Sequence, residues 1–165
     1  NLHNKVVIMF IYSINELVAS LNTGQILSGL DLGDKTIGVA ISDRGLVVAS
    51  PKTIIKRKGG IKDMESLKKI FDEYNVGAVV IGLPLSLDGG ENQRTQKTRE
   101  FAKNIANILY KPIYFQDERY SSDIVSKEMK KASFSNKKIK KYIDSASASY
   151  ILQGFLDTRN NSKRK

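Results

Sequence analysis

Five apolar runs along the chain have the length and composition of β-strands. They cover residues 26–32, 36–42, about 46–55, 76–83 and 113–116. Tight turns at Gly33-Asp34 and Arg44-Gly45 join the first three runs, which predicts an antiparallel meander, and Pro51 predicts a sheet edge for the third. The run at 76–83 is continuously apolar, which is typical of a parallel strand covered on both faces.

Helical periodicity precedes and separates these runs. A capping box from Ser13 to Glu16 starts a short amphipathic helix that we expect to end near Gly24. Further helices are predicted at 61–74, at 92–109 after the capping residue Asn92, at 122–131 and at 137–157. The inward residues predicted for the last helix and for the helix at 92–109 are Ile139, Ile143, Ala146, Tyr150, Ile151, Phe101, Ile105 and Ile108.

This order of elements predicts one α/β domain. Three antiparallel strands followed by two crossover-connected parallel strands make a mixed five-stranded sheet with helices on both faces. The domain is expected at 26–157, after an N-terminal leader and helix at 1–25 and before a basic, disordered tail at 158–165. Met9 is a plausible initiator, which leaves open whether residues 1–8 belong to the native protein.

The composition excludes several kinds of chemistry. The chain has no cysteine and one histidine, His3 near its start, so thiol catalysis, cysteine zinc sites and histidine metal clusters are not expected. Any reaction must then use carboxylates, amines or hydroxyls. The lack of cysteine favours a reducing, cytoplasmic location. The apolar run at 6–12 is too short to cross a bilayer, so the chain is not expected to be a membrane protein.

The charge is strongly positive and uneven. The formal net charge is +10, and residues 127–165 hold eleven Lys or Arg against Glu128, Asp144 and Asp157. Such a basic end favours a polyanionic partner, with nucleic acid first and a membrane surface second. The alternative is a solvated surface that only keeps the protein soluble.

One carboxylate lies inside a predicted buried strand. Asp31 interrupts the first apolar run, and an aspartate in a central strand needs a cation or hydrogen-bond donors to offset its burial. We expect Leu30 and Leu32 on one face of this strand and Ile26 and Ser28 on the other, both covered. The alternative is an edge strand with Asp31 in water.

Two further acids are predicted to join Asp31. Glu118 follows the last strand, and ligands of open α/β sheets bind beyond the carboxyl ends of parallel strands. Asp144 lies in the last helix, just before a run of small residues at 145–149 that allows a close approach to the sheet. Three such acids form an oxygen site that suits Mg²⁺ or Mn²⁺.

Each of these acids has another interpretation. Glu118 could pair with Arg119 or cap a helix, and Asp144 could face Lys140 or Lys141 one turn back. The acids held in reserve are Asp88 and Glu91 in the glycine-rich loop, whereas Asp117 is expected to be structural.

Four ordered motifs resemble those of the YqgF (RuvX) family of bacterial proteins. They are GLDLGDKTIGVAISD, VVIGLPLSLDGGENQRTQKTREFA, FQDERYSS and KKYIDSASASYILQGFLD, and together they extend the resemblance from about residue 26 to 157. The family is similar to RuvC-type Holliday-junction resolvases. The resemblance therefore implies an RNase H-like fold and a nuclease that processes the 5′ end of pre-16S rRNA in ribosome biogenesis. A Holliday junction resolvase acting on four-way DNA is the alternative.

The resemblance also assigns residues. The family's acidic positions fall on Asp31, Glu118 and Asp144, the three already chosen, which gives them catalytic and metal-binding roles. Its recurrent basic positions fall on Lys35, Arg94, Arg99 and Arg119. From the charge pattern, Lys137, Lys138, Lys140 and Lys141 are expected to extend the nucleic-acid-binding track.

The mechanism expected from these residues is two-metal phosphodiester hydrolysis. Two Mg²⁺ or Mn²⁺ ions roughly 3.5 to 4 Å apart would activate a water and stabilise the leaving oxygen, with Asp31 bridging them. Two other classes remain open. One is a non-catalytic RNA-binding or ribosome assembly factor. The other is an actin-like or sugar-kinase ATPase, which would need a second such domain. The sequence leaves open the oligomeric state and the choice between a precursor rRNA and branched DNA.

Overall fold

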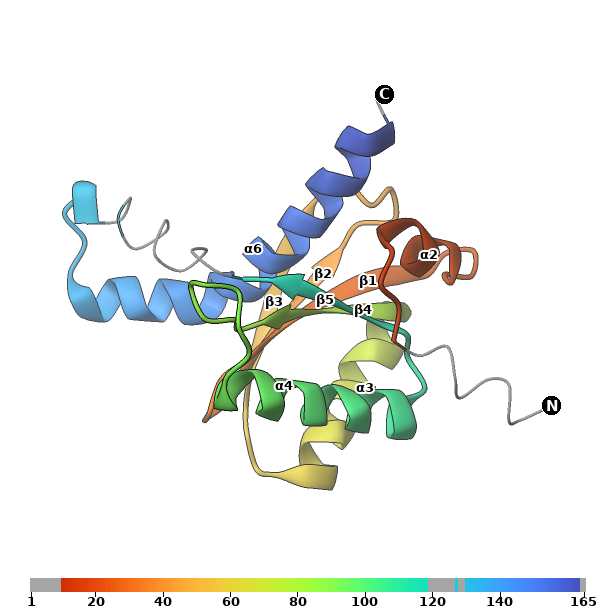
Figure 1. Cartoon of the computed structure of the whole chain (residues 1–165), viewed down its shortest axis with the longest axis horizontal. Helices are drawn as coiled ribbons and strands as arrows, with labels where there is room; N and C mark the ends of the chain where they lie inside the picture. The colour runs from red at the N-terminus through yellow and green to blue at the C-terminus, as the bar shows by residue number, and fades with distance from the viewer. Residues whose placement is uncertain (1–9, 119–126, 128–129, 164–165) are drawn as a thin grey trace.

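The five predicted strands form one mixed sheet in the computed structural model of the chain (Figure 1). The structure describes residues 10–118, 127 and 130–163, and for residues 140–145 only the backbone. The strand order is β3-β2-β1-β4-β5. The strands are β1 (Ile26–Leu32), β2 (Thr36–Ser42), β3 (Ala49–Lys56), β4 (Val76–Leu83) and β5 (Ile113–Asp117).

The strand directions confirm the predicted fold class. β1 is central, antiparallel to β2 and parallel to β4, and β4 is parallel to β5. The carboxyl ends of β1, β4 and β5 therefore lie at the same edge of the sheet, here called the carboxyl rim. β3 is an edge strand, as Pro51 indicated. Asp31 is thus on a central strand, and the edge-strand alternative is wrong.

Helices cover both faces of the sheet (Figure 1). α3 (Gly60–Tyr74) and α4 (Gln93–Asn104), which continues into the π-helix η1 (Ile105–Leu109), pack on one face. α6 (Asn136–Lys163) packs on the other, with α2 (Ile14–Ala19) beside it. The helix predicted at 122–131 lies almost entirely outside the described residues. None of the helices that the structure describes is long and apolar enough to cross a membrane.

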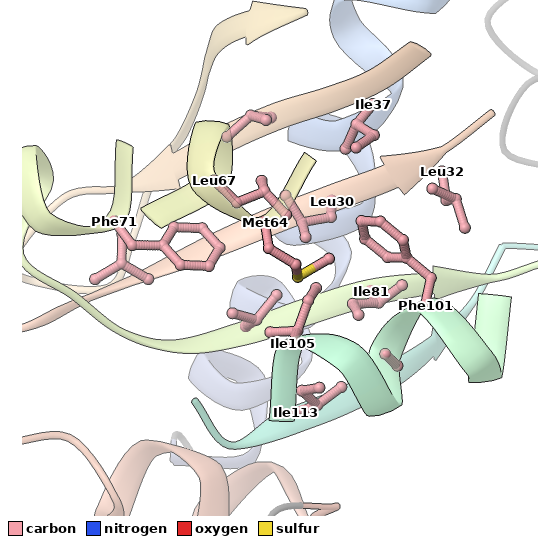
Figure 2. Packing of buried hydrophobic residues seen from close by; sticks show 14 of the residues in the cluster. Leu30, Leu32, Ile37, Met64, Leu67, Phe71, Ile81, Phe101, Ile105 and Ile113 are labelled. Carbon is pink, nitrogen blue, oxygen red and sulfur yellow. The ribbon is translucent and has the colours of Figure 1, made fainter. Parts of the chain in front are cut away.

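The apolar cores follow the strand alternation. In Figure 2, Leu30 of β1 lies among Met64 and Leu67 of α3 and Phe101 of α4, all nearly inaccessible to solvent. Ile26 belongs to this same cluster, so its predicted place on the opposite face is wrong. The reason is that residues four apart in a strand point to the same side. The opposite core, between the sheet and α6, is built from Leu27, Ala78, Val80, Ala148, Leu152 and Phe155.

Local signals place the helix starts well. Ser13 caps α2 by accepting a hydrogen bond from the Glu16 N–H. Asn92 caps α4 in a reciprocal capping box with Thr95. The third strand begins at Ala49 instead of 46, because Leu46 has a left-handed backbone (φ 56°) in a turn.

Three helical predictions are corrected by the structure. Ile108 is 48% exposed because the helix widens into the π-turns of η1, which rotates its side chain away from the sheet. Tyr150 is 43% exposed, and Ala148 and Leu152 take the inward positions. The tail expected to be disordered from 158 onward is helical to Lys163. Tertiary contact contributes to this extension, since the Asn160 side chain donates to the Leu46 carbonyl oxygen at 3.1 Å.

Candidate functional site

Asp31 lies one residue before the end of the central strand, on the face covered by α6. Gly29, two residues earlier and so on the same face, touches that helix closely: a Cβ built on it would lie 2.7 Å from Leu152 Cβ. The Asp31 carboxylate is half-buried, and Ser147 of α6 donates its hydroxyl to Oδ2 at 2.5 Å. The close contact of helix and strand therefore brings a hydrogen-bond donor to the carboxylate that the sequence singled out.

Glu118 reaches the same region from β5. Its backbone N–H donates to the Leu83 carbonyl oxygen at 3.3 Å, which prolongs the β4–β5 pairing by one residue. Its carboxyl group lies over Gly82 of β4: a Cβ built on that glycine would lie 2.6 Å from Glu118 Oε2 and 2.4 Å from Ile151 Cδ1 of α6. Glycine at position 82 thus leaves the room that the Glu118 side chain occupies under α6.

The two carboxyl groups influence each other. Burial raises the pKa of Glu118 to about 7, and the negative charges of Asp31 and Asp117 add to the rise, while Arg94 opposes it. Desolvation and a like charge both disfavour the ionised form of a carboxyl group. The structure therefore brings Asp31 and Glu118 together at the carboxyl rim, in surroundings that favour a cation.

Asp144 lies in α6, three residues before Ser147, and its side chain is outside the described part of the chain. Within the described residues, no group of three His, Cys, Asp or Glu side chains could hold a metal ion. The convergence of three acids therefore remains a prediction. The backbone position of Asp144 is compatible with this convergence, because Asp144 and Ser147 are three residues apart on one helix and therefore share a face.

The reserve acids have structural roles. Asp88 Oδ1 accepts a hydrogen bond from the Gly90 N–H at 2.8 Å and closes the loop after β4. Glu91 forms an ion pair with Arg99. Neither is needed to explain the acid pair at the rim.

The predicted basic residues differ in their surroundings. Lys35 is exposed in the β1–β2 turn, and Arg94 is exposed in the first turn of α4. Arg99 is paired with Glu91 and lies 5.1 Å from the ring centre of Phe115, so its charge is compensated. The predicted basic residues at the start of α6 whose side chains are described, Lys137 and Lys138, are both exposed. The side chains of Arg119, Lys140 and Lys141 lie outside the described residues.

The sequence analysis missed an ion pair near the rim between the half-buried Arg57 and the buried Asp63. Asp63, in the first turn of α3, is 1% exposed and accepts hydrogen bonds from the Lys58 N–H at 2.8 Å and the Gly59 N–H at 3.3 Å. Arg57 bonds to the Asp63 carboxylate at 3.5 Å and donates through Nη1 to the Gly33 carbonyl oxygen at 3.0 Å. The sequence pattern that could have indicated this pair is an acidic residue in the first turn of a helix, just after Gly59-Gly60. Only the fold shows that the pair also anchors the turn after Asp31.

The family model and the related sequences point to the same family. The sequence model of the RuvX family, described as Holliday junction resolvase, matches residues 25–158. A protein of Bartonella henselae described as "Putative pre-16S rRNA nuclease" is 43% identical over 153 residues, which are 93% of this chain and 96% of that protein. A protein of Mesorhizobium japonicum with the same description is 47% identical over 139 residues, 84% of each chain.

Solved structures give more distant likenesses. Thermus thermophilus RuvC, in complex with a Holliday junction substrate, is 13% identical with a TM-score of 0.48, over 82% of this chain and 95% of that one. The fowlpox virus resolvase, in complex with Holliday junction DNA, is 14% identical with a TM-score of 0.49, over 81% of this chain and 98% of that one.

Proposed function

Because this chain belongs to the RuvX family, we propose that it is a divalent-metal-dependent nuclease that hydrolyses phosphodiester bonds at the 5′ end of pre-16S rRNA. The observation that carries the proposal is the Asp31–Glu118 pair at the carboxyl rim, with the pKa of Glu118 raised to about 7. Relatives at 43 to 47% identity, each described as "Putative pre-16S rRNA nuclease", support the choice of substrate.

The acid pair fits a hard divalent cation. Both donors are carboxylates, and the described residues around them bring no cysteine or histidine. Two like charges held close together, one of them buried, are stabilised by a cation between them. Asp31, Glu118 and Asp144 would hold Mg²⁺ or Mn²⁺, in the predicted two-metal arrangement. When bound, the metal would activate the attacking water and stabilise the leaving oxygen.

The chain's own groups have distinct roles in this proposal. Ser147 fixes the orientation of the Asp31 carboxylate by donating to Oδ2. Glu118, with a pKa of about 7, holds or releases a proton near neutral pH, and its ionised form is the one that binds a cation. Arg94 brings a positive charge near Glu118 at the rim, where it would contact a substrate phosphate.

The phosphate chain beyond the cleaved bond would lie along the basic surface. Lys35 and Arg94 flank the rim, and Lys137 and Lys138 are exposed at the start of α6. Arg99, Arg119, Lys140 and Lys141 complete the proposed set. Contacts of this kind bind nucleic acid by its backbone, so substrate choice would depend on shape.

A second candidate is a resolvase of four-way DNA. The description of the matching family as Holliday junction resolvase favours it, and the same acid pair would serve either substrate. A non-catalytic role in RNA binding or ribosome assembly would need no metal at the rim.

A cleavage assay separates these functions. The substrates are a precursor rRNA fragment with its 5′ extension, a single-stranded RNA and a DNA four-way junction, each with and without Mn²⁺. We expect Mn²⁺-dependent cleavage of the precursor and loss of this cleavage in Asp31→Asn, with the fold intact. Asp72→Asn, which alters an exposed aspartate of α3, is the control and should cleave normally.

Three results would contradict the proposal. Full activity in Asp31→Asn would remove the acid pair from the reaction. Preference for the junction would favour the resolvase. No cleavage by the wild type, together with no Mn²⁺ binding by calorimetry, would favour the non-catalytic role.

A further inference from the structure

Two neighbouring hollows, together called the groove here, lie beside α4 on the α3/α4 face of the sheet. Its inner part is a cavity of about 220 Å³ between α3 and α4, with walls from Met64, Phe101 and Asn104. Its outer part is a smaller hollow of about 20 Å³ at the β1–β2 turn, lined in part by Gly33 and Arg94. Arg57 and Lys97 line both, so the two hollows adjoin.

One face of α4 lines both hollows. Arg94, Lys97, Thr98 and Phe101 are spaced i, i+3, i+4 and i+7, so one face of the helix lines the groove throughout. Arg94 is at the outer end, and its charge also acts on Glu118 at the rim. From Arg94 to Asn104 the helix rises about 15 Å, the scale of a few nucleotides.

The charges differ between the two ends. Asp63 lines the cavity, but its carboxylate is occupied by Arg57 and two backbone N–H groups. In the outer hollow, Arg94 and Lys97 are both exposed and face the single exposed acid Asp34. The outer end therefore suits phosphate groups, which long basic side chains bind readily.

The inner cavity has the properties of a base site. Met64 and Phe101, which are almost fully buried, form its apolar floor, and Asn104 and the exposed Glu100 bring hydrogen-bonding groups to its edge. The Arg57 guanidinium lies 5.4 Å from the Phe101 ring centre, and the Arg57 side chain keeps 28% of its surface exposed. Unpaired bases stack on aromatic rings and guanidinium planes and hydrogen-bond through their edges.

We propose that this groove binds a single-stranded segment of the substrate next to the cleaved bond, with phosphates at Arg94 and Lys97 and one unpaired base in the cavity between α3 and α4. The inference rests on the proposed nuclease function and names a substrate class for it: a structured nucleic acid with a single-stranded extension. Neither Arg57, Lys97 nor the cavity belongs to the acid site.

Binding in EDTA tests the groove without cleavage. The probes are a fluorescein-labelled RNA hairpin with a ten-nucleotide single-stranded extension, the same hairpin without it, and one whose extension is abasic, read by fluorescence anisotropy. We expect the wild type to bind the full extension at least about tenfold more tightly than either other probe, because stacking and base-edge contacts add affinity. Equal affinity for full and abasic extensions would overturn the base site.

Lys97→Glu and Lys103→Glu form a matched pair of variants. Both lysines are exposed on α4, but Lys103 does not line the groove. We expect Lys97→Glu to lose the preference for the extended probe and Lys103→Glu to keep it, with far-UV circular dichroism unchanged in both. The same preference in both variants would overturn the groove, even if the enzyme cleaves. Absence of cleavage by the wild type would instead count against the nuclease function, while the anisotropy would still decide the groove.

Discussion

At the scale of the residue, the most informative contact joins two positions 116 residues apart. Ser147 Oγ donates to Asp31 Oδ2 at 2.5 Å and is the hydrogen-bond partner described for that carboxylate. A carboxylate that binds a cation with one oxygen is oriented by a donor on the other. Ser147 is therefore a positioning residue in the proposed site.

Replacing Ser147 by alanine tests this role. We expect the affinity for Mn²⁺ to fall about tenfold or more, because the Asp31 carboxylate loses the donor that orients it. Titration calorimetry measures the change, and Ser147→Thr should restore much of it. The control is Ser149→Ala, whose hydroxyl donates only to the Ala146 carbonyl oxygen of its own helix. Equal Mn²⁺ affinity in Ser147→Ala and the wild type would contradict the assignment.

Glu118 makes stability depend on pH in a defined direction. Its pKa is raised from 4.5 to about 7 in the folded protein, so the folded state holds a proton that the unfolded state releases between these values. The metal-free protein should therefore lose stability as pH rises from about 4.5 to 7, by up to roughly 3 kcal/mol, and show no further loss from this group above that.

Urea unfolding in EDTA across this pH range measures the effect. Glu118→Gln should flatten the decline, because the neutral amide has no proton to lose. Glu65→Gln, at an exposed position of α3, should leave the decline unchanged. If the free energy of unfolding of the wild type rises between pH 4.5 and 7, the burial of Glu118 does not determine how stability depends on pH in this range.

At the scale of the element, the site depends on how closely α6 approaches β1. A Cβ on Gly29 would lie 2.7 Å from Leu152 Cβ and 2.8 Å from the Ala148 carbonyl oxygen, so backbone and helix leave no room for it. The small residues at 145–149 predicted this approach from the helix side. Their glycine partner on the strand was visible in the sequence, but the pairing became visible only in the fold.

Two alanine substitutions should have opposite effects on stability. Gly29→Ala should destabilise the fold by about 1 to 3 kcal/mol, because the methyl group forces the helix away from the strand. Gly154 lies within α6, and the Cβ of an alanine there would be 3.5 Å from Gln116 Nε2, which is an ordinary contact. It should stabilise the protein by up to about 1 kcal/mol through helix propensity. Thermal unfolding of both variants measures whether stability falls in Gly29→Ala and rises in Gly154→Ala.

At the scale of the whole molecule, the charge sets the salt dependence of binding. The net charge is +10, and Lys137 and Lys138 are exposed where α6 begins. If about five phosphates are neutralised, the slope of log affinity against log salt is near −4.5 on duplex and smaller on single strands. The basic surface therefore governs affinity without governing base preference.

Removing the charges of Lys137 and Lys138 tests whether this basic surface contacts the substrate. The double variant Lys137→Ala with Lys138→Ala should reduce the slope by about two, since each phosphate contact contributes close to one. Anisotropy with an RNA hairpin from low to high salt gives the slope. The control is Lys68→Ala with Lys69→Ala, on exposed positions of α3. A slope unchanged by the α6 variant would show that these lysines lie away from the substrate.

The sequence predicted the elements best where its signals are local. The bounds of β1, β2 and β4 match the predictions, and the capping residues Ser13 and Asn92 start their helices as expected. Local hydrogen bonds and alternating burial determine these features within a few residues. The predictions failed at Ile108, where the helix widens into η1, at Tyr150, and in the helical tail, where Asn160 contacts Leu46 of a distant turn.

By itself, the sequence determined the mixed α/β sheet and put forward Asp31, Glu118 and Asp144 as candidate site residues, because residue types and short-range patterns are sufficient for these predictions. The tertiary structure decided that Asp31 and Glu118 meet over Gly82, that Ser147 reaches Asp31, and that Arg57 and Lys97 border a groove beside α4. The physical reason is that such contacts join residues of different elements. Only the packing of helices on the sheet fixes their distances.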